Sequence, residues 1–562
     1  MSFSHWKRTL LIISLFCYLC SMVIVFLDNH HAYRWISFSL SILPTLLVLF
    51  VYLSSLKIKV GVIKNKEKLC LLLIVLLAVI SRFYLLGSYP FVSLGDEVRD
   101  SGYHTQRIAR GEITNLFEYG SYSSQGLIIP TLTLPFLLIF KNSVFVYRFP
   151  AAFVSIFDIV LIFLLLTNST KNKLSSFLGT LAIISLPLHL YYSRTEFVVI
   201  LSSLFSTAII IGLYSLLNRK MNFLEDFIYL GTICGFCFGL HGSIKAMALI
   251  VVMIILLKTV SAILVNQDRH KYLKRLLIFV LFIFIGFGPR LQFTKSFNIF
   301  FNTSRLPFTQ EKSSLTTSVD EPTLVNKYIK SLAVWVTQPT RTWYPDKKPI
   351  LTPLLFTIMM IGIIATLFEK DNFKLTLITV ALLLHMTNSA LTNEINQDHR
   401  FGPLWPISAL FIGYGVNFIF QKIKSKPITW AMAASLSTVL FLQVFSFFNN
   451  QPANFNKNSS DYLSMHLIYF LQDFSDSSNK TEYQISLSPK NFQEFITLHH
   501  QEQREFFLPN LNLIILQSEN LTDFEIKVQN NSIDTPNQVQ ISCTKNSLLC
   551  PIDQDRDYSI FY

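Results

Sequence analysis

Long blocks of uncharged apolar residues set the strongest limit on how this chain can fold. Blocks at 9–27, 197–217, 350–368 and 428–448 each approach the roughly 20 residues that a helix needs to cross a bilayer. The chain of 562 residues is 51% hydrophobic and 14% charged, whereas an average soluble domain is roughly 25% charged. These features exclude an ordinary soluble protein and predict a polytopic α-helical membrane protein.

Charge clusters and breaks at Pro, Gly and Asn divide the apolar sequence into thirteen predicted transmembrane helices. The block at 9–27 could be a secretory signal, but no small-residue cleavage site follows it, so we expect a retained anchor. The predicted helices lie at 9–27, 36–56, 69–86, 147–166, 174–192, 197–217, 227–243, 246–265, 276–290, 350–368, 375–391, 402–420 and 428–447.

The net charge of +13 could suggest a nucleic-acid partner, but the distribution of the charge indicates a membrane instead. Residues 449–562 hold 7 basic and 14 acidic residues, so the remainder of the chain carries a net charge of +20. The short loops on one side of the predicted topology carry twenty Lys and Arg residues, and those on the other side carry only Arg34, Arg194, Lys245 and Arg400. The positive-inside rule then predicts a cytoplasmic N-terminus and an extracytoplasmic tail, with no nucleic-acid partner.

This topology predicts three parts. Residues 1–68 form two transmembrane helices and a basic cytoplasmic loop, and residues 69–448 form the membrane core. The core carries two long outer loops, at 87–146 and 291–349, where any chemistry is expected. Residues 449–562 form a small extracytoplasmic domain.

The C-terminal domain is predicted to be α/β. Its two cysteines, Cys543 and Cys550, could form a disulfide or remain free thiols in an oxidising compartment. A separate apolar stretch in the first outer loop, at 127–140, is too short and too broken by prolines to span, so we expect it along the membrane surface. Helical patterns in the tail occupy 460–474 and 489–500, and strand-like runs occupy 483–487, 511–516, 524–528 and 538–542.

The first outer loop opens with adjacent carboxylates, Asp96 and Glu97, followed by Arg99. A carboxylate at the membrane surface can act as a general base, and an arginine can pair with an anionic phosphate through its planar fork of donors. The alternative is a solvated polar loop with a surface ion pair.

Other polar residues at the outer ends of predicted spans could likewise have either a functional or a structural role. Arg194 could contact a phosphate and Glu196 could make a structural contact. Lys245 and Arg400 could bind a phosphate or anchor the chain at the interface. His241 could bind a divalent metal with a loop carboxylate, or be a hydrogen-bonded structural residue at a helix end.

Asp158 differs from these residues because it lies inside an apolar stretch, where an ionisable side chain is costly. Its predicted depth is near the middle of the membrane. We therefore interpret Asp158 as a partner in helix packing rather than as a catalytic group.

Taken together, the segments in residues 69–420 resemble the membrane-embedded C-class glycosyltransferases, in the branch that contains protein O-mannosyltransferases and lipid A aminoarabinose transferases. The motifs that carry the resemblance are Arg82, the Asp96-Glu97 pair, Arg-Phe-Pro at 148–150, Pro-x-His-x-Tyr-Tyr-Ser-Arg at 187–194, Gly-Leu through Lys at 239–245, and Arg-Phe through two prolines at 400–406.

The resemblance implies inverting transfer of a sugar from a polyprenyl-phosphate donor to a hydroxyl of an envelope glycan, lipid or protein acceptor. Asp96 would be the base and Arg99 would contact the lipid phosphate, with Lys245 and Arg400 assisting. The sequence departs from the family at 124–126, where Ser-Gln-Gly replaces the usual charged residue, which puts a fixed divalent-metal site in doubt.

Two other functions stay open at the level of sequence. An O-antigen ligase or polymerase also handles lipid-linked sugars with outer-loop arginines, although the early Asp-Glu pair argues against it. A transporter of lipid-linked sugars would be expected to show an internal repeat, and no clear repeat is visible. A bacterial inner membrane is the expected location.

Overall fold

The computed structural model describes most of the membrane core and four short strands of the tail. The described residues are 5–27, 34–55, 65–87, 89–90, 102–113, 116, 127–140, 143–218, 224–265, 269–288, 323–340, 348–369, 371–390, 396–423, 425–454, 482–487, 512–517, 524–528 and 539–543.

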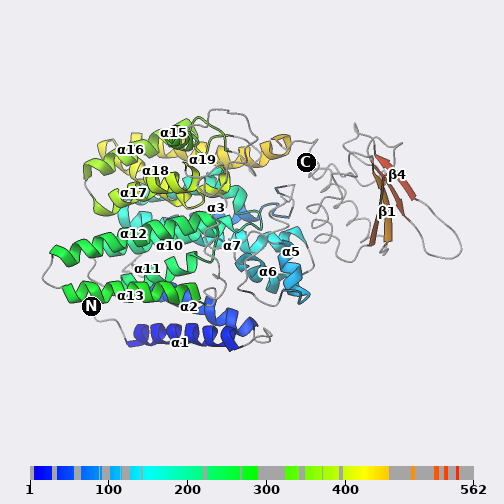
Figure 1. The fold of residues 1–562 in the computed structure, drawn as a ribbon. Helices are drawn as coiled ribbons and strands as arrows, with labels where there is room; N and C mark the ends of the chain where they lie inside the picture. Colours follow the sequence, from blue (N-terminus) through cyan, green and yellow to red (C-terminus); the bar gives the residue numbers. More distant parts are fainter. Residues whose placement is uncertain are drawn as a thin grey trace.

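The described core consists of helices gathered into one bundle, with the long helices running side by side (Figure 1). Within the described residues there are seventeen α-helices. They are α1 (His5–Leu27), α2 (Arg34–Ser55), α3 (Asn65–Phe83), α5 (Tyr103–Ala109), α6 (Ile128–Ile139), α7 (Val144–Thr170), α8 (Lys173–Ser185), α9 (Pro187–Tyr192), α10 (Val199–Asn218), α11 (Leu224–Cys237), α12 (Gly242–Val265), α13 (Arg269–Phe287), α15 (Leu324–Ala333), α16 (Pro353–Glu369), α17 (Asn372–His385), α18 (Leu404–Lys422) and α19 (Lys426–Asn454).

Two shorter helical turns complete the bundle. A π-helical turn, η5 (Met386–Ala390), continues α17, and a 3₁₀ turn, η6 (Asp398–Phe401), precedes α18.

Every predicted transmembrane segment coincides with a helix or with consecutive helices. Five of the described helices are long and apolar enough to cross a membrane, namely α7, α10, α12, α18 and α19. This supports a membrane protein, whereas the thirteen-span topology stays a prediction.

The continuous helix predicted over 174–192 is wrong in one respect, because the helix is interrupted after Ser185. Leu186 has an extended backbone and Pro187 begins α9. A proline ring disfavours the helical conformation of the residue before it, while its own missing N–H is tolerated at the first position of a new helix. The sequence is therefore folded into α8 and a short, separately oriented α9.

The centre of the bundle is formed by α10 and α18, which are buried over most of their surface, while α12 and α19 lie at the periphery. Their sequences explain the difference only in part, since all four are predominantly apolar. A helix that is apolar on every side can pack inside a protein or face lipid. The exposed apolar side chains of the peripheral helices, such as Leu257, Val265 and Trp430, fit the second environment.

Glycines allow two pairs of helices to approach closely. A Cβ atom at Gly362 of α16 would collide with the carbonyl oxygen of Phe411, and one at Gly415 of α18 would collide with that of Ile358. Gly235 of α11 and Gly286 of α13 face each other's helices in the same way. Small residues at such crossings are a common means of packing helices within membranes.

The first outer loop contributes two helices, α5 and α6. The stretch at 127–140, which the sequence placed along the membrane surface, forms α6, and its position relative to a membrane is not tested. Its first half is buried, while Leu138 and Ile139 at its end are 73% and 75% exposed. A small apolar cluster that includes Ile108 and Leu134 joins α5 to α6.

The tail contains four strands, β1 (Glu482–Leu487), β2 (Asn512–Gln517), β3 (Phe524–Val528) and β4 (Val539–Cys543). They form one sheet in the order β2-β1-β3-β4, in which only the β1–β2 pair is parallel. The strands match the four predicted runs to within one residue at each end. The helices predicted at 460–474 and 489–500, and Cys550, lie outside the described residues, so the α/β assignment and the disulfide stay open.

Candidate functional site

The residues that the sequence assigns to the reaction centre, Asp96, Glu97 and Arg99, lie outside the described residues. The chain is described as far as Pro90 and again from Gly102. Buried side chains of the bundle hold both of these flanking segments.

Arg194 connects the end of α3 to the turn that follows α9. Its Nη1 donates to the carbonyl oxygens of Ser81 (3.0 Å) and Arg82 (2.9 Å), and its Nη2 donates to that of Tyr84 (2.6 Å). The last carbonyl groups of a helix have no partner within the helix, and Arg194 supplies donors to them. This geometry gives Arg194 a structural role, and its assignment to a donor phosphate stays a prediction.

Arg148 of α7 holds the chain a few residues further on. Its Nη1 donates to the carbonyl oxygens of Pro90 (2.8 Å) and Leu86 (3.3 Å). Between them, the Tyr89 hydroxyl donates to the carbonyl oxygen of Phe448 at 2.9 Å. Burial raises the pKa of Tyr89 to about 12, so its hydroxyl stays protonated and can donate.

Glu196 holds the chain on the far side of segment 91–101. The Thr105 hydroxyl of α5 donates to Glu196 Oε1 at 3.0 Å, and both side chains are fully buried. Next to it, the Gln106 amide donates to the hydroxyl of Tyr147 on α7 at 3.2 Å. Hydrogen bonds therefore fix to the bundle the described residues that precede and follow segment 91–101, which contains the predicted base.

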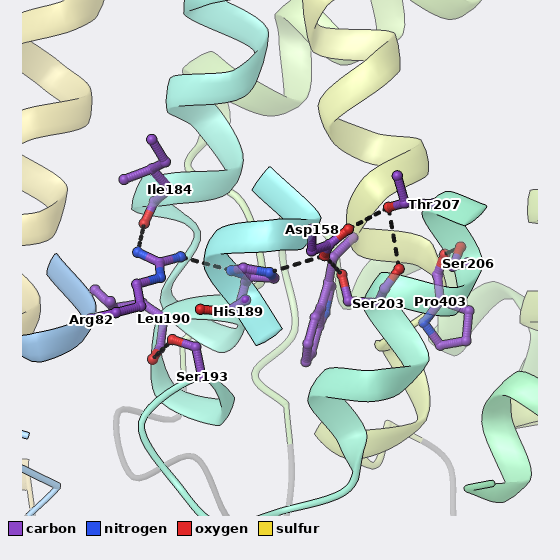
Figure 2. Close-up of polar contacts among 12 residues, drawn as sticks. Arg82, Asp158, Ile184, His189, Leu190, Ser193, Ser203, Ser206, Thr207 and Pro403 are labelled. Atoms are coloured by element: carbon purple, nitrogen blue, oxygen red, sulfur yellow. Dashed lines mark hydrogen bonds and ion pairs between the residues drawn. The ribbon is translucent and has the colours of Figure 1, made fainter. Parts of the chain in front are cut away.

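A fully buried polar network lies at the centre of the bundle, beside this anchoring region (Figure 2). Arg82, at the end of α3, lies 2.7 Å from Nδ1 of His189 on α9, and Nε2 of His189 lies 3.3 Å from Asp158 on α7. The hydroxyl groups of Ser203 and Thr207 on α10 donate to Asp158 at 2.6 and 2.5 Å. We call these five residues the buried network.

The chemistry of arginine fixes the protonation of His189. A guanidinium group has only donors, so Nδ1 of His189 accepts a hydrogen bond from Arg82, and the ring hydrogen lies on Nε2, where it faces Asp158. The histidine is then neutral and connects a cation to an anion. The network has no net charge, which reduces the cost of burying its charges. The interpretation of Asp158 as a helix-packing residue agrees with this arrangement, since its contacts join α7, α9 and α10.

Aromatic contacts lead from the buried network to η6. The ring of Trp405, the second residue of α18, lies edge-on to His189 at 5.8 Å between ring centres and stacks on Tyr192 at 5.7 Å. The Tyr192 hydroxyl donates to the buried carboxylate of Asp398 at 2.8 Å. The motif at 187–194 thus makes three separate contacts. His189 belongs to the buried network, Tyr192 contacts η6, and Arg194 contacts the end of α3.

Four basic residues gather where α12 begins and η6 ends, and we call them the basic cluster: His241, Lys245, His399 and Arg400. The rings of His241 and His399 lie edge-on, 5.5 Å apart. Lys245 and Arg400 are only 5% and 8% exposed. Such residues are almost never fully buried unless paired, and both make contacts within the protein.

Asn388 of η5 joins the two chain segments of the basic cluster. Its amide nitrogen donates to the carbonyl oxygen of Arg400 at 3.2 Å and lies 3.4 Å from that of Ser243 in the first turn of α12. The N-terminus of α12 adds the positive end of a helix dipole to the same place. The structure thus brings together the chain segments that carry Lys245 and Arg400, while their assignment to the donor phosphate stays a prediction.

His241 makes the contacts of a helix-capping residue. Its Nδ1 accepts from the backbone N–H of Ser243 at 3.3 Å and lies 2.8 Å from the Ser243 hydroxyl. A search of the described residues finds no group of three or more His, Cys, Asp or Glu side chains suited to a metal ion. The assignment of His241 to a divalent metal stays a prediction.

Several of these roles could not be found from the sequence. Arg148 and His189 lie in motifs that the sequence singled out, but nothing local indicates which atoms they contact. Tyr192 and Asp398 are 206 positions apart in the chain. The only local signals are a charged residue in an apolar stretch, as at Asp158, and arginines at the outer ends of spans.

Comparison with known proteins adds no relative to this picture. No protein-family model matches the chain, and no curated protein matches it significantly.

Proposed function

We propose that this chain is an inverting glycosyltransferase of the membrane, which moves a sugar from a polyprenyl-phosphate donor to a hydroxyl acceptor at the outer face. In this proposal all thirteen predicted segments span the membrane, the N-terminus is cytoplasmic and the tail is extracytoplasmic. The bundle supplies the apolar surroundings that a long polyprenyl chain requires.

The basic cluster is the observation that carries the proposal. Lys245 and Arg400 come from distant parts of the sequence, both are nearly buried, and Asn388 joins the chain segments that carry them beside the N-terminus of α12. Cations in such a place interact strongly with a phosphate because little water screens them. A lipid phosphate leaves a sugar readily only when its growing negative charge is neutralised, and this cluster can provide that neutralisation.

The anchored first loop gives the second line of support. Arg148 donates to the carbonyl oxygen of Pro90 and Glu196 accepts from Thr105, so the described chain on either side of segment 91–101 is held by the bundle, and we propose that this positions the base. Transfer then needs Asp96 to take the proton of the acceptor hydroxyl. The acceptor oxygen forms a bond to the anomeric carbon from the face opposite the phosphate, and the bond between that carbon and the phosphate oxygen breaks, with inversion.

Binding of a polyprenyl phosphate to the purified protein in nanodiscs tests the proposal. Lys245→Ala and Arg400→Ala should each weaken binding by at least about tenfold, since a hydrogen bond to a charged group contributes roughly 1.5–3 kcal/mol. Arg107→Ala is the control, because this residue forms a surface ion pair with Glu112 at 3.1 Å and should leave binding unchanged. Normal binding by both cluster variants would contradict the proposal.

A further inference from the structure

One short helix of the second outer loop exposes apolar residues that the function above does not use. In α15, Leu324, Val325 and Ile329 are 48%, 66% and 57% exposed. With 3.6 residues per turn they occupy one side of the helix. An exposed apolar face of this kind normally marks a surface that contacts a protein or a lipid.

The opposite side of α15 is polar and basic. Asn326, Lys327 and Lys330 lie there, and the helix contains no acidic residue. A helix with one apolar face and lysines on the other is typical of segments that lie in the plane of a membrane surface and attract anionic lipids.

The position of α15 is fixed by hydrogen bonds to the end of α17. The Tyr328 hydroxyl donates to the carbonyl oxygen of Leu382 at 3.2 Å. His385, the last residue of α17, lies 3.0 Å from the Ser331 hydroxyl through Nδ1 and accepts the indole N–H of Trp335 at 2.8 Å through Nε2. Because an indole can only donate, the hydrogen of His385 lies on Nδ1 and points at Ser331.

The apolar surface continues from α15 onto its neighbour. Leu382, Leu383 and Met386, around the end of α17, are 45%, 37% and 38% exposed. The other end of α17 is marked by an ion pair between Lys374 and Glu369. An apolar surface therefore runs along α17, with α15 at one end and a charged pair at the other. Lipid headgroups would contact the two ends of such a surface.

We propose that α15 lies in the membrane interface, with Val325 and Ile329 among the acyl chains and with Lys327 and Lys330 bound to anionic phospholipid headgroups. The occupant of this face is lipid, because the apolar face is continuous with α17 and the lysines match an anionic headgroup. The proposal rests on the membrane location that the proposed function also assumes. It does not depend on the sugar-transfer chemistry.

Photocrosslinking in the full-length protein tests this inference. A benzophenone amino acid replaces Val325 or Ile329 on the apolar face, or Asn326 on the polar face, in nanodiscs made of equal parts phosphatidylcholine and phosphatidylglycerol. Mass analysis then identifies the adducts. The same group at Phe368, which is 80% exposed on α16, serves as a positive control for lipid contact.

We expect lipid adducts at positions 325 and 329 and at least fivefold fewer at position 326. Phosphatidylglycerol adducts should exceed phosphatidylcholine adducts several-fold, and the double change Lys327→Gln with Lys330→Gln should abolish this preference. Adducts to a protein segment at positions 325 and 329, or no adducts there, would overturn the inference. If Phe368 still gave lipid adducts in that case, the membrane location would stand. Absence of lipid adducts at Phe368 as well would overturn both.

Discussion

At the scale of single residues, Asp158 shows how a carboxylate can be kept inside an apolar bundle. Three donors, from His189, Ser203 and Thr207, point at its two oxygens, and the positive charge of Arg82 lies one ring away. A buried charge that lost these partners would be very costly. The network is therefore expected to matter mainly for stability and for the orientation of α9.

Asp158→Asn should destabilise the protein by about 3–5 kcal/mol, because it removes the negative charge that Arg82 and its neighbours surround. Unfolding can be followed with a thiol-reactive dye, since Cys234 and Cys237 are completely buried. Arg82→Gln should lower the free energy of unfolding less in the Asp158→Asn variant than in the wild type, because the two charges stabilise each other. Additive losses would show that the two side chains are not coupled.

Arg194→Lys should also lower the thermal stability markedly, although the charge is kept. A lysine ammonium cannot reproduce the planar fork that contacts the carbonyls of Ser81, Arg82 and Tyr84. Arg107→Lys is the matched control, because its partner Glu112 is 44% exposed and such surface pairs contribute little. Equal effects of the two changes, measured with the same dye, would contradict the structural role of Arg194.

At the scale of elements, the sequence located the helices well and their interruptions less well. Each apolar block between charged breaks coincides with a helix or with consecutive helices, and the strand-like runs coincide with the four strands. The break at Pro187 was missed because the flanking residues are long enough and apolar enough for one continuous span. The π-helical turn η5 also has no local signal, and the contacts of Asn388 show that packing against α12 and η6 accompanies it.

For the candidate site too, the sequence identified individual residues but not the contacts between them. The sequence selected Lys245 and Arg400 as cations at span ends, but only the fold shows that Asn388 joins the chain segments that carry them. Ser203 and Thr207 were not foreseen, because hydroxyl groups in an apolar helix commonly bond to their own backbone. Their contact with Asp158 depends on how α7 and α10 are placed.

Gly415→Ala should destabilise the bundle by at least about 1–3 kcal/mol, because the added methyl group would force α18 away from α16. Thermal unfolding of the purified variant measures the loss. Gly242→Ala is the control, since a Cβ atom there would meet nothing within 4 Å. A Gly415→Ala variant as stable as the control would show that the two helices are not so closely packed.

At the scale of the whole molecule, the distribution of charge predicts the orientation. If all thirteen predicted segments span the membrane, the basic N-terminal flank predicts an extracytoplasmic tail. After reduction of any disulfide between them, Cys543 or Cys550 should therefore be labelled by an impermeant thiol reagent added to intact spheroplasts. Labelling only after the membrane is opened would contradict the orientation and the outer location of the site together.

Mass analysis of lipid-linked sugars and envelope glycans, in cells with and without this protein, tests the proposed transfer reaction most directly. We predict that one glycosyl polyprenyl phosphate accumulates when the protein is absent, while one sugar disappears from an envelope acceptor. Wild-type protein should restore both, and Asp96→Asn should not, because general-base loss slows turnover by roughly 10²–10⁴-fold. Unchanged lipid-linked sugars and glycans, or full restoration by Asp96→Asn beside a dead Glu97→Gln, would contradict the assignment.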